Sequence, residues 1–147
     1  VLALACDLRV CTPAARFGIP IARTLGNCLS GANCARLLDR IGPDRVKDLL
    51  FTGRFIDAAE ANALGLVARM AQPDTVGGVV GELAATIAAN APLTTRATKE
   101  VVRRIGAARS LDREATDDLI AACYTSDDFR NAVAAFLAKR PASFTGH

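Results

Sequence analysis

The sequence predicts an α/β fold in which a mixed core is followed by a region made of helices alone. Residues 1–71 alternate short, apolar, strand-like stretches with amphipathic helical patterns, whereas residues 72–147 carry only helical patterns. Hydrophobic residues make up 51% of the 147, which is enough apolar content to fill one compact core. We therefore expect an α/β core over 1–71 and a helical subdomain over 72–147.

Composition and charge exclude several classes of function. The net charge is +3, with Lys and Arg interspersed among Asp and Glu, so nothing predicts a nucleic-acid partner. No apolar run reaches the roughly 20 residues that span a bilayer, so we expect no membrane partner. The five cysteines contain no C-x-x-C pair and the only histidine is His147, so we expect no metal site. The thiols are expected to be reduced and mostly buried.

The first residues do not have the pattern of a domain start. The chain begins with Val1 in the apolar run VLALACDLRV, without a helix cap or a turn. We therefore expect the sequence to enter a longer protein inside an element, with any targeting segment upstream. A cytoplasmic location is the default expectation.

Short elements are expected in the first 20 residues. Residues 2–7 (LALACD) suit a short helix, and residues 8–12 (LRVCT) suit a buried strand. Residues 15–20 (ARFGIP) predict a second extended piece that ends in a turn, because Gly18 and Pro20 are turn formers.

The pattern becomes helical from residue 31. Residues 31–41 place their apolar side chains on one stripe and stop at Gly42, which suits a helix C-terminus. Pro43 then suits the first turn of a second helix, where a missing N–H costs nothing. That helix is expected to end at Gly53.

A capping box predicts the next helix. Asp57 and Glu60 have its spacing, and Gly65 marks the end of the helix. Two carboxylates three residues apart resemble an acid–base pair, but we interpret them as a helix start. Residues 66–70 (LVARM) predict a short strand, and 72–75 a polar link.

The rest of the chain predicts four helices. They span residues 76–91, 92–108, 111–124 and 126–140, the last with Ser126 as its N-cap. Their apolar faces are wider than one small core needs, so we expect a self-association surface here. The apolar side chains that need burial are Val101, Val102, Ile105, Leu119, Ile120, Val133, Phe136 and Leu137. Of these, Phe136 is expected in the core of the chain itself.

Several of these stretches, in this order and spacing, resemble the crotonase (enoyl-CoA hydratase/isomerase) superfamily. The resemblance covers essentially the whole chain. It rests on LALACDLRV at 2–10, ARFGIP at 15–20, LLDRIGPDRVKDLLFTGRFIDAAEANALGLV at 37–67, Ala91-Pro92 with Lys99, and AFLAKRPASF at 135–144.

The resemblance implies both a fold and a chemistry. The fold is a spiral of ββα repeats, whose second half would be residues 1–71, followed by helices that build a homotrimer or a hexamer. The chemistry is lyase or isomerase action on an acyl-CoA thioester in fatty acid metabolism, with coenzyme A entering as part of the substrate and no further cofactor. Family members polarise the thioester carbonyl with two backbone N–H groups, and both match positions upstream of Val1. We therefore expect this chain alone to be inactive.

Hydratases of the superfamily also use two glutamates, which position water and move protons. The motif alignment puts these glutamates at Val1 and Ile21, and an aliphatic side chain has no proton to exchange. Neither neighbour of Ile21 is acidic, since they are Pro20 and Ala22. The sequence therefore predicts no catalytic residue and marks Val1 and Ile21 as the positions of lost acids.

Other reactive residues leave alternatives open. Asp7 is the nearest carboxylate, but the resemblance implies a structural role for it. Cys28 and Ser30 are nucleophiles by type, yet no histidine is available to activate them. Arg23 either meets a CoA phosphate or a substrate carboxylate, or is an exposed loop arginine.

Four residues are expected to bind substrate. Ile21 and Leu25 would line the acyl pocket. In relatives the C-terminal tail contacts the CoA bound to a neighbouring subunit, so Lys139 would attract phosphate and Phe144 would stack on adenine. The alternative for this tail is helix-end packing, with basic residues that complement the helix dipole.

Two hypotheses about function follow. In the first, the chain belongs to an enoyl-CoA hydratase/isomerase-like, acyl-CoA-binding protein that lacks the hydratase glutamates and acts through its oxyanion hole alone. In the second, it is a non-catalytic, degenerate paralogue or remnant that acts only as a subunit of an oligomer.

Overall fold

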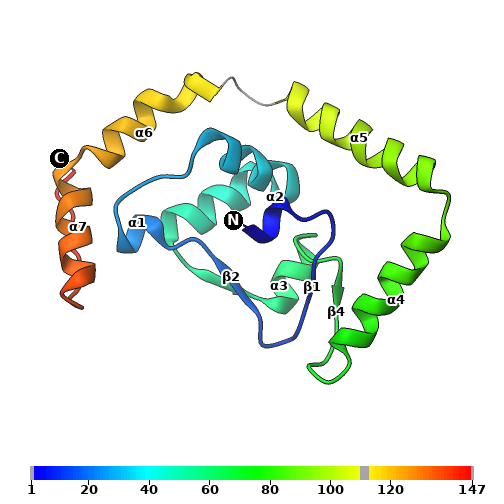
Figure 1. Cartoon of the computed structure of the whole chain (residues 1–147). Helices are drawn as coiled ribbons and strands as arrows, with labels where there is room; N and C mark the ends of the chain where they lie inside the picture. The colour runs from blue at the N-terminus through cyan, green and yellow to red at the C-terminus, as the bar shows by residue number, and fades with distance from the viewer. Residues whose placement is uncertain (1, 110–112, 147) are drawn as a thin grey trace. The chain divides into compact units, whose positions relative to one another are not determined.

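The computed structural model describes residues 2–109 and 113–146 (Figure 1). The chain forms two compact units. The first unit combines residues 1–15 with 57–110, and the second combines residues 16–56 with 111–147. Each unit therefore takes segments from both sides of residue 71, where the secondary structure changes to helices only. Val1 lies outside the described residues.

The first unit is built on a pair of parallel strands. Val10 lies opposite Arg69, and Cys11 lies opposite Met70. Its elements are the 3-10 helix η1 (Leu2–Ala5), β1 (Val10–Cys11), α3 (Ala58–Ala63), β4 (Arg69–Met70), α4 (Val76–Ala89) and α5 (Pro92–Ala108). Its core side chains are Leu4, Cys11, Ala58, Ala61, Leu66 and Val67. Four of these six belong to the capped helix α3 and the segment after it, which leads into β4.

Arg9 holds the end of η1 in the first unit. Its Nε donates to the carbonyl oxygen of Leu66 at 2.5 Å, and its Nη1 donates to that of Cys6 at 2.7 Å. The cap of α3 is also local, since the Asp57 carboxylate accepts the N–H of Glu60 at 2.8 Å. This contact confirms the Asp57 N-cap predicted from the sequence.

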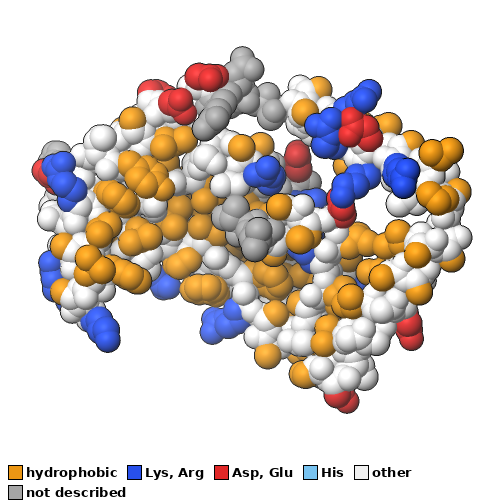
Figure 2. Space-filling model, viewed as in Figure 1, with side chains coloured by type: hydrophobic (Ala, Val, Ile, Leu, Met, Phe, Trp, Pro, Cys, Tyr) orange, Lys and Arg blue, Asp and Glu red, His pale blue; other side chains and the backbone are white. Residues whose placement is uncertain are grey.

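Helices α4 and α5 expose their side chains, and none of their described residues is buried within the chain. Figure 2 shows Lys and Arg side chains mixed with Asp and Glu over α5. Lys99 pairs with Asp7 at 2.5 Å, while Glu100 accepts from Arg103 at 2.7 Å and from Arg104 at 2.8 Å. These hydrogen bonds from Arg103 and Arg104 lower the pKa of Glu100 to about 2.

Among the described helices, no single one is long and apolar enough to cross a membrane. Only α4 and α5 together satisfy length and composition, and they are bent by 105° at their junction.

The second unit is organised by the broken helix α2 (Gly31–Thr52). Its backbone leaves the helical region at Gly42, where φ is 74° and ψ is 167°, so two helices meet there. The second ends at Gly53, which has φ 59° and ψ 22°. Both helix ends confirm the sequence predictions. The other elements are β2 (Arg16–Gly18), α1 (Ile21–Thr24), η2 (Arg113–Thr116), α6 (Asp117–Tyr124) and α7 (Asp127–Leu137).

Strand β3 (Phe55–Asp57) pairs with β2 and was not predicted from the sequence. It has only three residues, and Ile56 alone is buried. A single inward side chain gives no alternation for a sequence pattern to detect. The core of the second unit consists of Leu37, Ile41, Val46, Leu49, Ile56, Ala132 and Ala135.

Several elements are shorter than expected. The strand expected over 8–12 contains only Val10–Cys11, and the strand expected over 66–70 contains only Arg69–Met70. The helix expected over 111–124 is split into η2 and α6, and its residues 111 and 112 lie outside the described residues. The expected N-cap of α7 is confirmed, since the Ser126 hydroxyl accepts the N–H of Phe129 at 3.0 Å.

Two burial expectations are wrong for the chain by itself. Phe136 is 66% exposed, because α7 turns Ala132 and Ala135 inward and leaves the next position outside. Of the cysteines only Cys11 is buried, while Cys6 is exposed and the other three are half-buried. Cys6 is exposed because it follows η1 in a surface bend.

Candidate substrate-binding site

The loop at residues 17–26 is a rigid turn organised by Pro20. The carbonyl oxygen of Pro20 accepts the N–H of Arg23 at 3.1 Å and the N–H of Thr24 at 3.0 Å. It also accepts the hydroxyl of Thr24 at 2.8 Å. One proline carbonyl therefore fixes the whole of α1, which has only four residues.

Ile21 and Leu25 lie at the two ends of this turn. The carbonyl oxygen of Ile21 accepts the N–H groups of Leu25 and Gly26, both at 2.8 Å. The side chains of Ile21 and Leu25 are half-buried, whereas Arg23 is exposed. The exposed side chain agrees with the interpretation of Arg23 as an exposed loop arginine.

Two glycines let the loop approach the rest of the second unit closely. A Cβ on Gly18 would lie 2.7 Å from Cδ1 of Phe55, so no side chain fits there. A Cβ on Gly53 would lie 3.2 Å from Cβ of Arg23. The loop is therefore pressed against the end of α2 and the start of β3.

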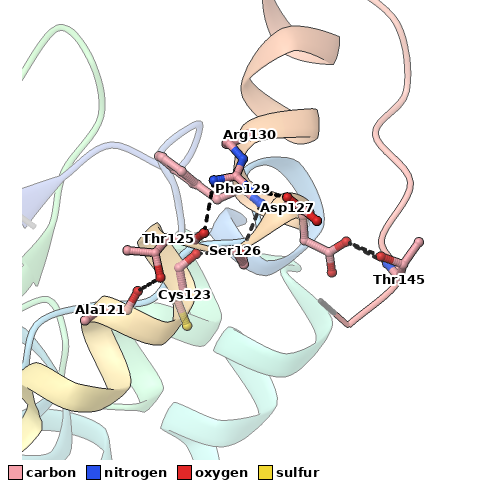
Figure 3. Close-up of polar contacts among 9 residues, drawn as sticks. Ala121, Cys123, Thr125, Ser126, Asp127, Phe129, Arg130 and Thr145 are labelled. Atoms are coloured by element: carbon pink, nitrogen blue, oxygen red, sulfur yellow. Dashed lines mark hydrogen bonds and ion pairs between the residues drawn. The ribbon is translucent and has the colours of Figure 1, made fainter.

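The C-terminal tail reaches the far end of the same loop. A Cβ on Gly26 would lie 3.0 Å from Cε1 of Phe144, so the phenyl ring rests on the glycine. The Asp128 carboxylate anchors the tail by accepting the N–H of Thr145 at 2.7 Å, its hydroxyl at 3.0 Å, and the N–H of Gly146 at 2.8 Å. Figure 3 shows Thr145 tied in this way to the start of α7. Phe144, predicted to bind substrate, thus lies beside the loop that carries Ile21 and Leu25.

Lys139 occupies a special backbone position at the end of α7. Its N–H donates to the carbonyl of Phe136 at 3.1 Å, and the N–H of Arg140 donates to that of Ala135 at 3.0 Å. This pair of bonds is a Schellman motif, which normally places glycine where the backbone is left-handed. Lys139 has φ 54° and is the one described non-glycine residue with a positive φ. Its side chain is exposed.

The loop contains no acid or base. The sequence has no Asp or Glu between Asp7 and Asp39, and Asp7 is engaged in its ion pair with Lys99 in the first unit. Cys28 is no activated nucleophile, because desolvation and the neighbouring Cys123 raise the pKa of its thiol to about 11. Ser30 is exposed at the N-cap of α2 and makes no side-chain cap.

Comparison with known proteins gives the family. A sequence model of enoyl-CoA hydratase/isomerase matches residues 1–147. The chain belongs to this family. Two similar relatives are short-chain-enoyl-CoA hydratases: that of Clostridioides difficile is 35% identical over 92% of this chain, and that of Clostridium acetobutylicum is 31% identical over 95%. The chain spans 87% of the first relative and 53% of the second.

Similarity to a solved structure confirms the predicted fold class. Methylmalonyl-CoA decarboxylase in complex with 2-nitronate-propionyl-CoA matches 98% of this chain with a TM-score of 0.90 and 27% identity. The match covers 56% of the decarboxylase chain. This member of the enoyl-CoA hydratase/isomerase family therefore has the crotonase-type α/β fold, with a helical C-terminal region.

Sequence reasoning found the loop and the tail separately but not their contact. Phe144 contacts the loop at Gly26, whose N–H donates to the carbonyl of Ile21, whereas Lys139 lies at the end of α7. Gly26 and Asp128 were missed as the residues that make this contact possible. Neither residue could be found from the sequence, because a local pattern does not indicate contact with a distant segment.

We predict that Gly26→Ala loosens the tail. The change adds a Cβ at φ 66° and presses it against the ring of Phe144, so stability should fall by more than the roughly 1–2 kcal/mol of left-handed strain alone. Urea unfolding should show a larger loss than in Gly65→Ala, where φ is 73° and nothing lies within 4 Å. Amide exchange at Thr145 and Gly146 should also become faster. Unchanged exchange at these two amides would mean that the Phe144 contact does not hold the tail.

We also predict that Lys139→Gly stabilises the protein. Glycine adopts the left-handed conformation without strain, so the free energy of unfolding should rise by about 1 kcal/mol. Lys139→Ala is the control, since it removes the same charge but keeps the Cβ, and it should give no such gain. Equal stability of the two variants in urea unfolding would disprove the backbone explanation.

Proposed function

We propose that this chain binds the acyl part of an acyl-CoA thioester at the 17–26 loop and lacks the acid that family hydratases use to activate water. The observation that carries the proposal is the loop itself. It is a rigid, half-buried turn with Ile21 at the position that the motif alignment gives to a glutamate, and no carboxylate is nearby in sequence. An apolar wall favours an acyl chain over the water that a hydratase must add.

The relatives support an acyl-CoA substrate. Two are short-chain-enoyl-CoA hydratases, and the structural neighbour is a decarboxylase bound to a propionyl-CoA analogue. Decarboxylation consumes no water, so this fold also serves chemistry that needs no water-activating glutamate. In this proposal the protein belongs to fatty acyl-CoA metabolism, as a lyase or an isomerase.

Residues of two copies of the chain divide the substrate between them. Ile21 and Leu25 of one copy contact the acyl chain and keep its surroundings dry. Phe144 of a neighbouring copy offers a flat apolar face to the adenine. Lys139 supplies a positive charge for the CoA phosphates.

We predict that butyryl-CoA binds at least about tenfold more tightly than free CoA, because each buried methylene contributes about 0.8 kcal/mol. Titration calorimetry should show that Ile21→Glu removes this preference, while Lys139→Ala weakens both ligands equally. The unchanged chain should not hydrate crotonyl-CoA above a heat-killed control. Equal affinity for the two ligands, or measurable hydration, would contradict the proposal.

Ile21→Glu should also make stability depend on pH. A carboxyl group in this apolar position has a raised pKa, so it favours folding only while protonated. Relative to Ile21→Gln, the variant should lose about 1–2 kcal/mol as the pH rises from about 4 to 7. Urea unfolding at both pH values measures this difference, and a constant gap between the two variants would show that Ile21 lies in a wet environment.

A second candidate function is that of a non-catalytic oligomer subunit. One observation favours it: none of the described side chains of α4, α5 and α6 is buried within the chain. Leu93 is 79% exposed and Val101 is 54% exposed. In this proposal, further copies of the chain cover this apolar surface in a homotrimer or hexamer.

We predict that light scattering shows trimers or larger assemblies. Val101→Glu should shift the chain toward monomer, because it places a charge in the apolar face of α5. Arg96→Glu is the control on another face, since positions five apart lie far around a helix. A stable monomer in the unchanged chain would rule out the oligomer-subunit function.

A further inference from the structure

Three of the five thiols gather in the second unit, around the segment between α1 and α2. Cys28 lies in that segment, Cys34 in the first turn of α2, and Cys123 in the last turn of α6. All three are half-buried and none is in a disulfide. The Cys28 thiol contacts the carbonyl of Leu119, one helical turn before Cys123, and the nearby Cys123 helps to raise its pKa.

Two other contacts fix this segment along α6. The Cys28 thiol donates to the carbonyl of Leu119 at 4.0 Å, and the side-chain amide of Asn27 donates to the hydroxyl of Tyr124 at 3.0 Å. Positions 119 and 123 share one face of a helix, because they are one turn apart. The segment is therefore held in register, with Cys28 facing Cys123.

Cys34 is held differently. Its thiol points back to the carbonyl of Leu29, at 4.0 Å, within its own part of the chain. The cluster is also not a metal site, since no three potential ligands among residues 2–109 and 113–146 are arranged to hold an ion. Two thiols on neighbouring segments can instead form a bond between their sulfurs.

We propose that Cys28 and Cys123 are a redox modification site that forms an intramolecular disulfide in the presence of a peroxide. One thiolate attacks the peroxide and becomes a sulfenic acid, releasing water once a proton is taken up. The second sulfur then displaces the hydroxyl group as a further water, forming the S–S bond. Two thiols and one hydrogen peroxide thus give one disulfide and two waters.

The surroundings set the rate of this reaction. Desolvation and the neighbouring sulfurs raise the pKa of Cys28 to about 11, so its thiol is protonated at neutral pH. Attack by Cys28 on the peroxide is therefore slow at pH 7 and becomes faster as the pH rises, because the thiolate is the attacking form. Once formed, the disulfide fastens the segment that follows the 17–26 loop to α6.

The test is peptide mapping of the full chain after treatment with hydrogen peroxide. Trypsin should release residues 24–36, which contain Cys28 and Cys34, linked to residues 114–130, which contain Cys123. The same linked pair should form in Cys34→Ala and be absent from both Cys28→Ala and Cys123→Ala. The midpoint of thermal unfolding should rise by several degrees on oxidation, because the disulfide closes a long loop.

Alkylation of the unchanged protein gives an independent readout that needs no variant to fold. After oxidation, iodoacetamide should label Cys34 fully and leave Cys28 and Cys123 unlabelled. A link between Cys28 and Cys34 would overturn the proposal. So would a link between two chains, or sulfinic acid at Cys28 with Cys123 still free.

Discussion

The carbonyl of Pro20 accepts three hydrogen bonds, and this turn determines where the loop, the end of α2 and the C-terminal tail meet. A proline is suited to this role, because its ring fixes φ and its missing N–H is not needed at the start of a helix. The turn places Gly26 against the ring of Phe144, and it places Arg23 against Gly53. Of the residues that we assign to substrate, Ile21 and Leu25 are positioned by this turn, and Phe144 contacts the loop at Gly26.

The elements that the sequence predicted correctly are those with local physical causes. Gly42 followed by Pro43 breaks a helix through the geometry of two adjacent residues. Asp57 and Ser126 each satisfy an N–H three residues ahead, so their caps can be recognised within one turn. Such signals need no knowledge of the rest of the fold.

The features that were missed depend on contacts between distant segments. Strand β3 exists because β2 pairs with it, and only Ile56 of its three residues is buried. Phe136 is large and apolar, as core residues usually are. However, α7 packs through Ala132 and Ala135 and leaves the ring of Phe136 exposed. The contact between Phe144 and Gly26 joins residues far apart in the sequence, so no periodicity could have indicated it. The sequence therefore offers the candidate site residues one by one and does not give their arrangement.

The charged side chains of α5 affect which forces could drive its association with another chain. Glu100 is engaged by two arginines of its own helix, and Lys99 by Asp7, so these groups are already satisfied within one chain. Surface pairs of this kind contribute little to association and are screened by salt. The large apolar side chains that α5 exposes are Leu93, Val101, Val102 and Ile105. Association through α5 would therefore be driven by apolar burial, which salt does not screen and which weakens on cooling. An assembly that fell apart in moderate salt would instead point to the charged face of α5 as the contact.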